Sequence, residues 1–217
     1  IYDRTTRGLR IYLATPRLRG LLALNLAVAA ASAMVIVNTV VLVQADFRLS
    51  QHATALALAA FGAGSMVAAL FLPRLLDKIP DRRAMLTGSG FGYSMTQTPS
   101  GRLLRRSAHP EDRPALFAAQ FALSHACWLI TYPLAGWLGA AMGLPFTFVA
   151  LGLMAALAVS VAVRLWPAAD PEELDHTHET LEVSHPHLLN AITVDNGYRH
   201  RHAFVIDRHH TEWPRFR

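Results

Sequence analysis

Histidine is concentrated toward the C-terminus, where eight of the eleven histidines of this 217-residue chain lie. Three pairs have the spacing H-x-H, and residues two apart in an extended chain project to the same side, so each pair can present two imidazoles to one ion. Repetition of such pairs favours a metal-binding segment over the alternative, a merely polar tail. The candidate metal ligands are His176, His178, His185, His187, His200, His202, His209 and His210.

Carboxylates lie between these histidines, at Glu172, Glu173, Asp175, Glu179 and Glu182. Imidazole together with carboxylate suits a divalent Ni, Co, Zn or Cu ion. Because the segment has no thiolate cluster, the choice among these metals stays open.

A second group of polar side chains lies inside apolar stretches, where burial in lipid costs free energy unless the groups pair or line a cavity. Residues 120, 124 and 128 lie four apart and share one helical face, with residues 125 and 132 on a neighbouring face. The imidazole at 125 can carry a proton near neutral pH or bind a metal ion. Hydrogen bonds that only hold a helical bundle together are the alternative. The candidate substrate and proton pathway comprises Asn38, Gln120, Ser124, His125, Trp128 and Tyr132.

The elements that must position these groups are helices long enough to cross a bilayer. No Asp, Glu, Lys or Arg occurs from Leu21 to Val43, from Ala53 to Leu72 or from Pro114 to Val163. At roughly 1.5 Å per residue the last stretch is long enough for two spans, joined by a turn at Gly143 and Pro145. The predicted spans are residues 20–44, 53–73, 114–139 and 144–165.

Basic residues are unevenly distributed outside these spans. They are concentrated in the lead 1–19 and the link 74–113, whereas the turn between the last two spans has no charge. By the positive-inside rule the lead, the link and the tail 167–217 are cytoplasmic, so both ends of this chain lie on that side. The basic excess therefore indicates membrane orientation, and we do not expect nucleic acid as a partner.

The tail and part of the link lack the pattern of a span. Apolar periodicity is lost after residue 166, which predicts a soluble tail that is disordered without a ligand. Residues 84–98 are uncharged but too short to span, so they form a re-entrant or interfacial piece or the remains of missing spans. The predicted fold class is an all-α integral membrane bundle of about four transmembrane helices with a disordered tail.

A short segment after the second span carries a family resemblance. Residues 73–83, PRLLDKIPDRR, resemble the G-x-L-x-D-R-x-G-R-R loop of the major facilitator superfamily, and Gly62-Ala63-Gly64-Ser65 in the preceding helix would allow close helix packing. The resemblance implies that residues 1–166 are a partial C-terminal half of such a permease, closest with its His-rich tail to bacterial metal-efflux members. It also implies a conformational gating loop formed by Asp77, Arg82 and Arg83.

The family's C-terminal half has six helices, and this sequence offers four. We therefore expect a truncated, internally deleted or misassembled chain, whose partner would be the missing transporter half. The expected function is secondary active efflux across the bacterial inner membrane, coupled to protons and directed at a divalent transition-metal ion, with no cofactor required. An organic small-molecule substrate, or a non-transporting membrane fragment with a metal-binding tail, are the alternatives. The sequence contains no nucleophile–base motif and no glycine-rich phosphate loop, so we do not expect an enzyme.

Overall fold

The computed structural model describes residues 2–76, 79–88, 93–179, 181, 185–188 and 191–214. Within these residues, four helices are long enough and apolar enough to cross a membrane, and each contains one predicted span. The first continues beyond its α-helical part as a π-helical segment, η1 (Val41–Asp46). The four helices are α2 (Pro16–Val40), α3 (Gln51–Leu76), α6 (Arg113–Met142) and α7 (Leu144–Leu165).

A glycine separates the last two of these helices. Gly143 has φ 84°, in the region that glycine adopts without the steric cost of a Cβ, and it ends α6. Pro145 lies in the first turn of α7, where its missing N–H breaks no helical hydrogen bond. The helical hairpin therefore reverses at the turn expected from the sequence.

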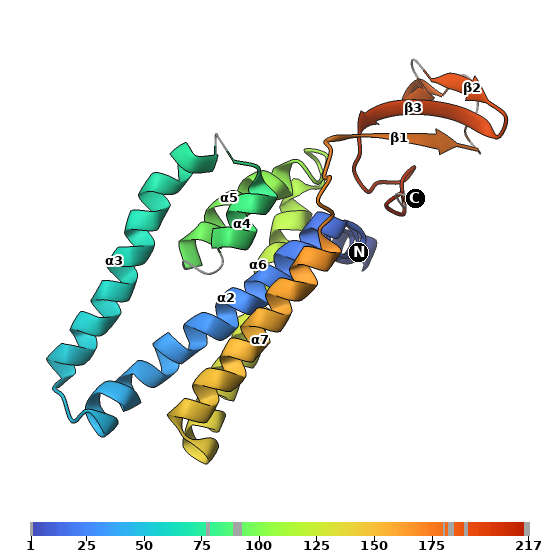
Figure 1. Ribbon diagram of the computed structural model, residues 1–217. Helices are drawn as coiled ribbons and strands as arrows, with labels where there is room; N and C mark the ends of the chain where they lie inside the picture. The colour runs from blue at the N-terminus through green and yellow to red at the C-terminus, as the bar shows by residue number, and fades with distance from the viewer. Residues whose placement is uncertain are drawn as a thin grey trace.

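Helices α2, α6 and α7 pack together, and α3 stands apart from them (Figure 1). Only 6% of the apolar window of α3 is buried, against 44% for α2, so α3 is the element with the largest unpartnered apolar surface among the four. The expected close packing at its small residues is absent from the described part of the chain, because a Cβ built at Gly62 or Gly64 would meet nothing within 4 Å.

Three shorter helices lie at the end of the bundle that faces the tail: α1 (Tyr2–Ala14), α4 (Asp81–Gly88) and α5 (Tyr93–Arg105) (Figure 1). The described residues of the uncharged stretch 84–98 belong to α4 and α5. Neither helix is long enough to span a bilayer. Met85, Leu103 and Leu104 are buried in the core that these helices share with α1 and α2.

The tail is folded, so the prediction of a disordered tail and of an all-α chain is wrong for this segment. Its strands are β1 (Glu173–His178), β2 (Ile192–Val194) and β3 (Gly197–Ala203), which form an antiparallel sheet in the order β1-β3-β2 (Figure 1). A short 3₁₀ helix, η2 (Pro186–Leu188), lies between β1 and β2.

Contacts distant in sequence explain why the tail folds. Leu174 on β1 and Phe204 and Ile206 after β3 are buried in one apolar cluster with Leu18 of α2 and Trp166 at the end of α7. Composition predicts disorder because the tail alone has too few apolar residues to offset its chain entropy. The end of the bundle supplies the missing apolar surface.

Candidate metal centre

The two longer strands place four histidines on one face of the sheet. His176 and His178 lie two apart on β1, and His200 and His202 lie two apart on β3, so each pair projects to one side. The register pairs His176 with His200 across the two strands. Adjacent strands therefore bring the two H-x-H pairs together, which the sequence spacing alone does not do.

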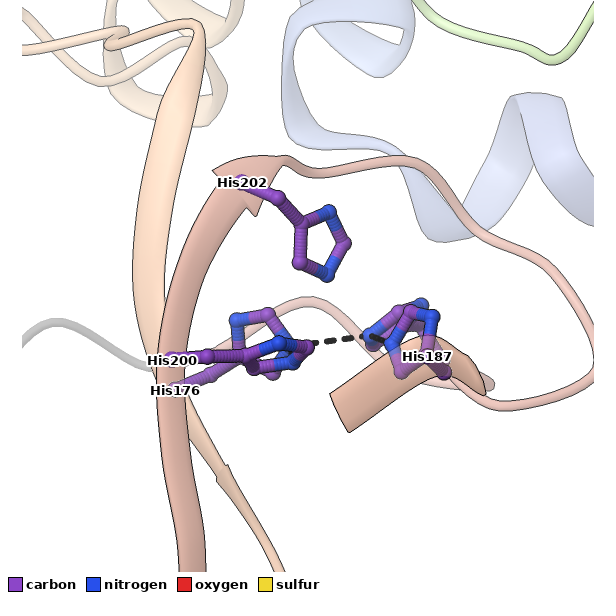
Figure 2. Close-up of side chains that lie close together, drawn as sticks. His176, His187, His200 and His202 are labelled. Atoms are coloured by element: carbon purple, nitrogen blue, oxygen red, sulfur yellow. Dashed lines mark hydrogen bonds between the residues drawn. The ribbon is translucent and has the colours of Figure 1, made fainter. Parts of the chain in front are cut away.

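Two more histidines reach this face from outside the sheet. His187 comes from η2, and His210 comes from the segment after β3. The Nε2 atom of His210 lies 2.9 Å from Nε2 of His176 and 3.3 Å from Nε2 of His187. Figure 2 shows the ring of His187 facing those of His176 and His200 across the site, with His202 alongside. The five residues whose ligand atoms lie within 4.8 Å of one another, a group that could hold a metal ion, are His176, His187, His200, His202 and His210.

His178 completes a set of six rings, because its Nε2 lies 3.1 Å from Nε2 of His176. We call the six the hexahistidine cluster, which comprises His176, His178, His187, His200, His202 and His210. Four of its rings form a closed square, in which the centroids of His178 and His200 are 5.1 Å apart and those of His200 and His202 are 4.7 Å apart. The square closes from His202 to His210 at 5.1 Å and from His210 to His178 at 5.0 Å.

The other two rings cap this square from opposite sides. The centroid of His176 lies 4.7–4.9 Å from all four rings of the square, and the centroid of His187 lies 4.9 Å from the same four. The six rings thus occupy the corners of an octahedron, with His176 and His187 as its two poles.

Hydrogen bonds to the far side of three rings fix which nitrogen faces the centre. The Nδ1–H groups of His176 and His202 donate to the carbonyl oxygens of Leu174, at 3.1 Å, and Ala203, at 2.8 Å. The Nδ1–H of His210 donates to Oδ1 of Asp207 at 3.0 Å. In a neutral imidazole the other nitrogen, Nε2, then carries a lone pair and no proton. The Nε2 of His202 is buried without a hydrogen-bond partner among the described residues.

The environment keeps four rings of the cluster uncharged near neutral pH. Burial, followed by the charges of the neighbouring imidazoles, lowers the pKa of His176, His178 and His187 to about 4. Burial and the neighbouring His202 also lower the pKa of His200. These four rings are therefore in the neutral form that binds a metal ion, and no proton has to be displaced from them at pH 7.

Asp207 is a functional residue that the sequence reasoning missed. Burial opposes its ionisation, but the hydrogen bonds from the ring and backbone of His210 and from the backbone of His209 outweigh burial and lower its pKa. Its second oxygen, Oδ2, lies 3.3 Å from Nε2 of His109, in the loop after α5. A carboxylate that orients a ligand histidine is a common feature of metal sites. The D-x-x-H spacing from Asp207 to His210 is the sequence feature that could have identified this carboxylate.

The remaining histidines of the tail lie beside the cluster. Nδ1 of His185 accepts the backbone N–H of His187 at 3.2 Å, and the ring of His209 stacks on His187 with centroids 5.3 Å apart. The described carboxylates of β1 lie away from the cluster: Asp175 pairs with Arg199 and Glu173 with Arg201, and these residues alternate with the histidines along the strands.

The structure separates the six candidate pathway residues. His125, Trp128 and Tyr132 line a cavity of about 370 Å³ between α2, α3 and α6. Its other lining residues are Ser32, Ile36, Phe61 and Ser65.

The other three pathway candidates make structural hydrogen bonds. Asn38 donates to the carbonyl oxygen of Ala135 at 3.3 Å. Gln120 accepts the hydroxyl of Tyr12 at 2.5 Å, and the hydroxyl of Ser124 donates to a backbone carbonyl of α6. These bonds join two helices or stabilise a single helix. Holding the helical bundle together is the role that the alternative interpretation gives to such polar side chains.

The gating loop is only partly described. Asp77 lies outside the described residues. Nε of Arg82 donates to the carbonyl oxygen of Trp166 at 2.9 Å, at the C-terminal end of α7, whereas the side chain of Arg83 is exposed. Among the described residues nearby, Arg102 and Asp81 form an ion pair, in which Nε of Arg102 donates to Oδ1 of Asp81 at 3.0 Å.

Comparison of the chain with protein-family models, with curated proteins and with solved structures finds no match.

Proposed function

We propose that the chain is part of a membrane-embedded, proton-coupled efflux permease for a divalent transition-metal ion, and that the hexahistidine cluster captures the ion at the cytoplasmic surface. The convergence of imidazole nitrogens at one end of four membrane-length helices carries this proposal. The resemblance of residues 73–83 to the major facilitator loop supports the transport part of it.

The first experiment measures metal binding by the purified full chain in detergent. Equilibrium dialysis followed by elemental analysis should detect one divalent ion per chain. The double substitution of His176→Ala and His210→Ala removes two close ligands and should weaken binding markedly. His52→Ala is the matched control, since His52 lies at the start of α3, outside the metal centre. Unchanged binding by the double variant would contradict the proposed site.

The second experiment measures transport in sealed vesicles that contain the full chain. An imposed proton gradient should drive metal accumulation, and a protonophore should abolish it. The same double variant should lower the initial rate at low metal concentration, because capture precedes transport. Gradient-independent accumulation, or none, would exclude this chain as a proton-coupled permease while leaving metal binding intact.

The cavity favours a second candidate function, transport of an organic small molecule. Aromatic and apolar side chains form most of its lining, and the centroids of Trp128 and Tyr132 lie 5.0 Å apart, which suits a flat organic solute better than a hydrated ion. A resistance panel in cells expressing the chain separates the candidates. Protection against organic compounds that is lost in Trp128→Ala but retained in the histidine double variant would favour the second.

A further inference from the structure

The nitrogen atoms around His176 have the spacing of adjacent ligands in a six-coordinate metal site. Metal–imidazole bonds of about 2.1 Å place adjacent nitrogens of an octahedron about 3.0 Å apart and opposite ones about 4.2 Å apart. The measured Nε2 separations from His176 are 3.1 Å to His178, 3.2 Å to His200 and 2.9 Å to His210. His187, the pole opposite His176, belongs with it to the group of ligand atoms within 4.8 Å.

Hydrogen bonding does not account for the shortest of these distances, between His176 and His210, when both rings are neutral. The Nδ1–H groups of His176 and His210 both donate outward, to Leu174 and Asp207, so both Nε2 atoms carry lone pairs. Two lone pairs 2.9 Å apart repel each other unless a cation lies between them. The buried Nε2 of His202, which has no hydrogen-bond partner in the described part of the chain, would be satisfied by the same ion.

We propose that the hexahistidine cluster is an octahedral six-nitrogen site that selects Ni²⁺ over Zn²⁺ and Cu²⁺. This inference rests on the proposed metal-binding function and specifies its ion. Imidazole ligands disfavour the hard ions Mg²⁺, Ca²⁺ and Mn²⁺, which prefer oxygen. Zn²⁺ binds four ligands in a tetrahedron and gains little from the fifth and sixth. Cu²⁺ prefers a tetragonal arrangement, which six near-equivalent nitrogens do not offer.

Nickel is the strongest binder among the ions that remain. Fe²⁺, Co²⁺ and Ni²⁺ accept six nitrogen ligands, and affinity rises in that order along the first transition series. The rigid supports of the site, two paired strands and the Asp207 hydrogen bond to His210, prevent collapse onto a smaller coordination number.

Competition between metals tests the selectivity in the purified full chain. Dialysed against equimolar Ni²⁺ and Zn²⁺, the chain should retain one ion, with Ni²⁺ in excess. His178→Ala removes one corner of the square and should abolish that excess while Zn²⁺ binding persists, because four imidazoles suffice for zinc. His52→Ala, at the start of α3 and outside the metal centre, is the matched control and should leave the excess unchanged.

Spectroscopy tests the coordination number without any substitution. X-ray absorption at the nickel edge should give six nitrogen neighbours, and the Co²⁺-loaded chain should show the weak visible bands of six-coordinate cobalt. Intense tetrahedral cobalt bands, or a preference for Zn²⁺, would overturn the octahedral assignment and leave metal binding standing. If no divalent ion binds the chain, the proposed function fails together with this inference.

Discussion

The orientation of single imidazoles controls the metal centre, and Asp207 controls one of them. Its carboxylate accepts the Nδ1–H of His210 together with two backbone N–H groups, which turns Nε2 of His210 toward His176. An ionised carboxylate behind a ligand also raises the basicity of the imidazole. Binding strength therefore depends on a residue that does not touch the ion.

Replacing Asp207 should weaken metal binding without removing a ligand. Asp207→Asn keeps the shape of the side chain but removes its charge, so we expect a loss of affinity of roughly 10–100-fold. Equilibrium dialysis against Ni²⁺ measures it. Asp195→Asn, an exposed change in the turn before β3, should bind as the unsubstituted chain does. Equal affinities of the two variants for Ni²⁺ would show that Asp207 does not contribute to metal binding.

The depressed histidine pKa values predict acid sensitivity of the metal-free tail. In the folded chain His176, His178 and His187 have a pKa of about 4, against an ordinary 6.5. Between these values the unfolded chain binds more protons than the folded one, so stability is full above pH 6.5 and falls as the pH is lowered toward 4. Nuclear magnetic resonance of the histidine ring protons should follow both the titration and the loss of tail structure. Titration of these rings near pH 6.5 in the folded chain would contradict the prediction.

At the scale of elements, the register of β1 and β3 matters more than the presence of histidines. A shift of one residue would move one H-x-H pair to the opposite face of the sheet, where Asp175 and Arg199 now pair. Gly197, in the turn between β2 and β3, lets His178 of β1 approach closely in that register. Gly197 pairs with Val194 at the turn and has φ 136°.

Substitution of Gly197 should therefore destabilise the sheet and the metal centre together. A Cβ at this position would lie 2.2 Å from the carbonyl oxygen of His178, and the φ is unfavourable for any other residue. We expect Gly197→Ala to cost about 1–3 kcal/mol from backbone strain alone, and more from the clash. Thermal melting of the tail with and without Ni²⁺ measures the loss. Gly101→Ala is the control, since a Cβ there meets nothing within 4 Å in the described residues.

At the scale of the whole molecule, the tail and the helical bundle form one structure. Arg17 of α2 forms an ion pair with Asp170 at 3.4 Å, and its guanidinium lies 4.8 Å from the ring centre of Trp213 near the C-terminus. Asp207 and His109 connect the metal centre to the loop after α5. A metal ion held by His210 would therefore be connected, through Asp207 and then His109, to the loop that joins α5 to α6.

Removing the apolar contact between tail and bundle should abolish metal binding, and the Phe204 ring also packs against His210 with centroids 4.6 Å apart. Phe204 is 2% exposed and belongs to the shared core, so Phe204→Ala should cost about 3–5 kcal/mol. Nickel retention by the full chain should fall with it. Ile192→Ala is the matched control on β2, because Ile192 is 70% exposed. A variant at Phe204 that keeps full nickel retention would show that the tail holds its fold without the bundle.

Local features of the sequence determined the helices and the residue type of the metal centre. The length of each uncharged stretch predicts the membrane-length helices, because helix rise per residue is fixed, and the H-x-H spacing places two rings on one side of any extended segment. Gly143 likewise marks the helical turn through its own backbone preference. These are properties of residues close together in the chain.

Only the tertiary structure decided that the tail folds and that its histidines form an octahedron. His176 meets His210 across 34 positions and Asp207 meets His109 across 98, and no local pattern specifies such pairs. The apolar surface that offsets the entropy of ordering the tail comes from Leu18 and Trp166 in the bundle. Composition counts the residues within a segment, whereas folding depends on the surface that a distant segment supplies.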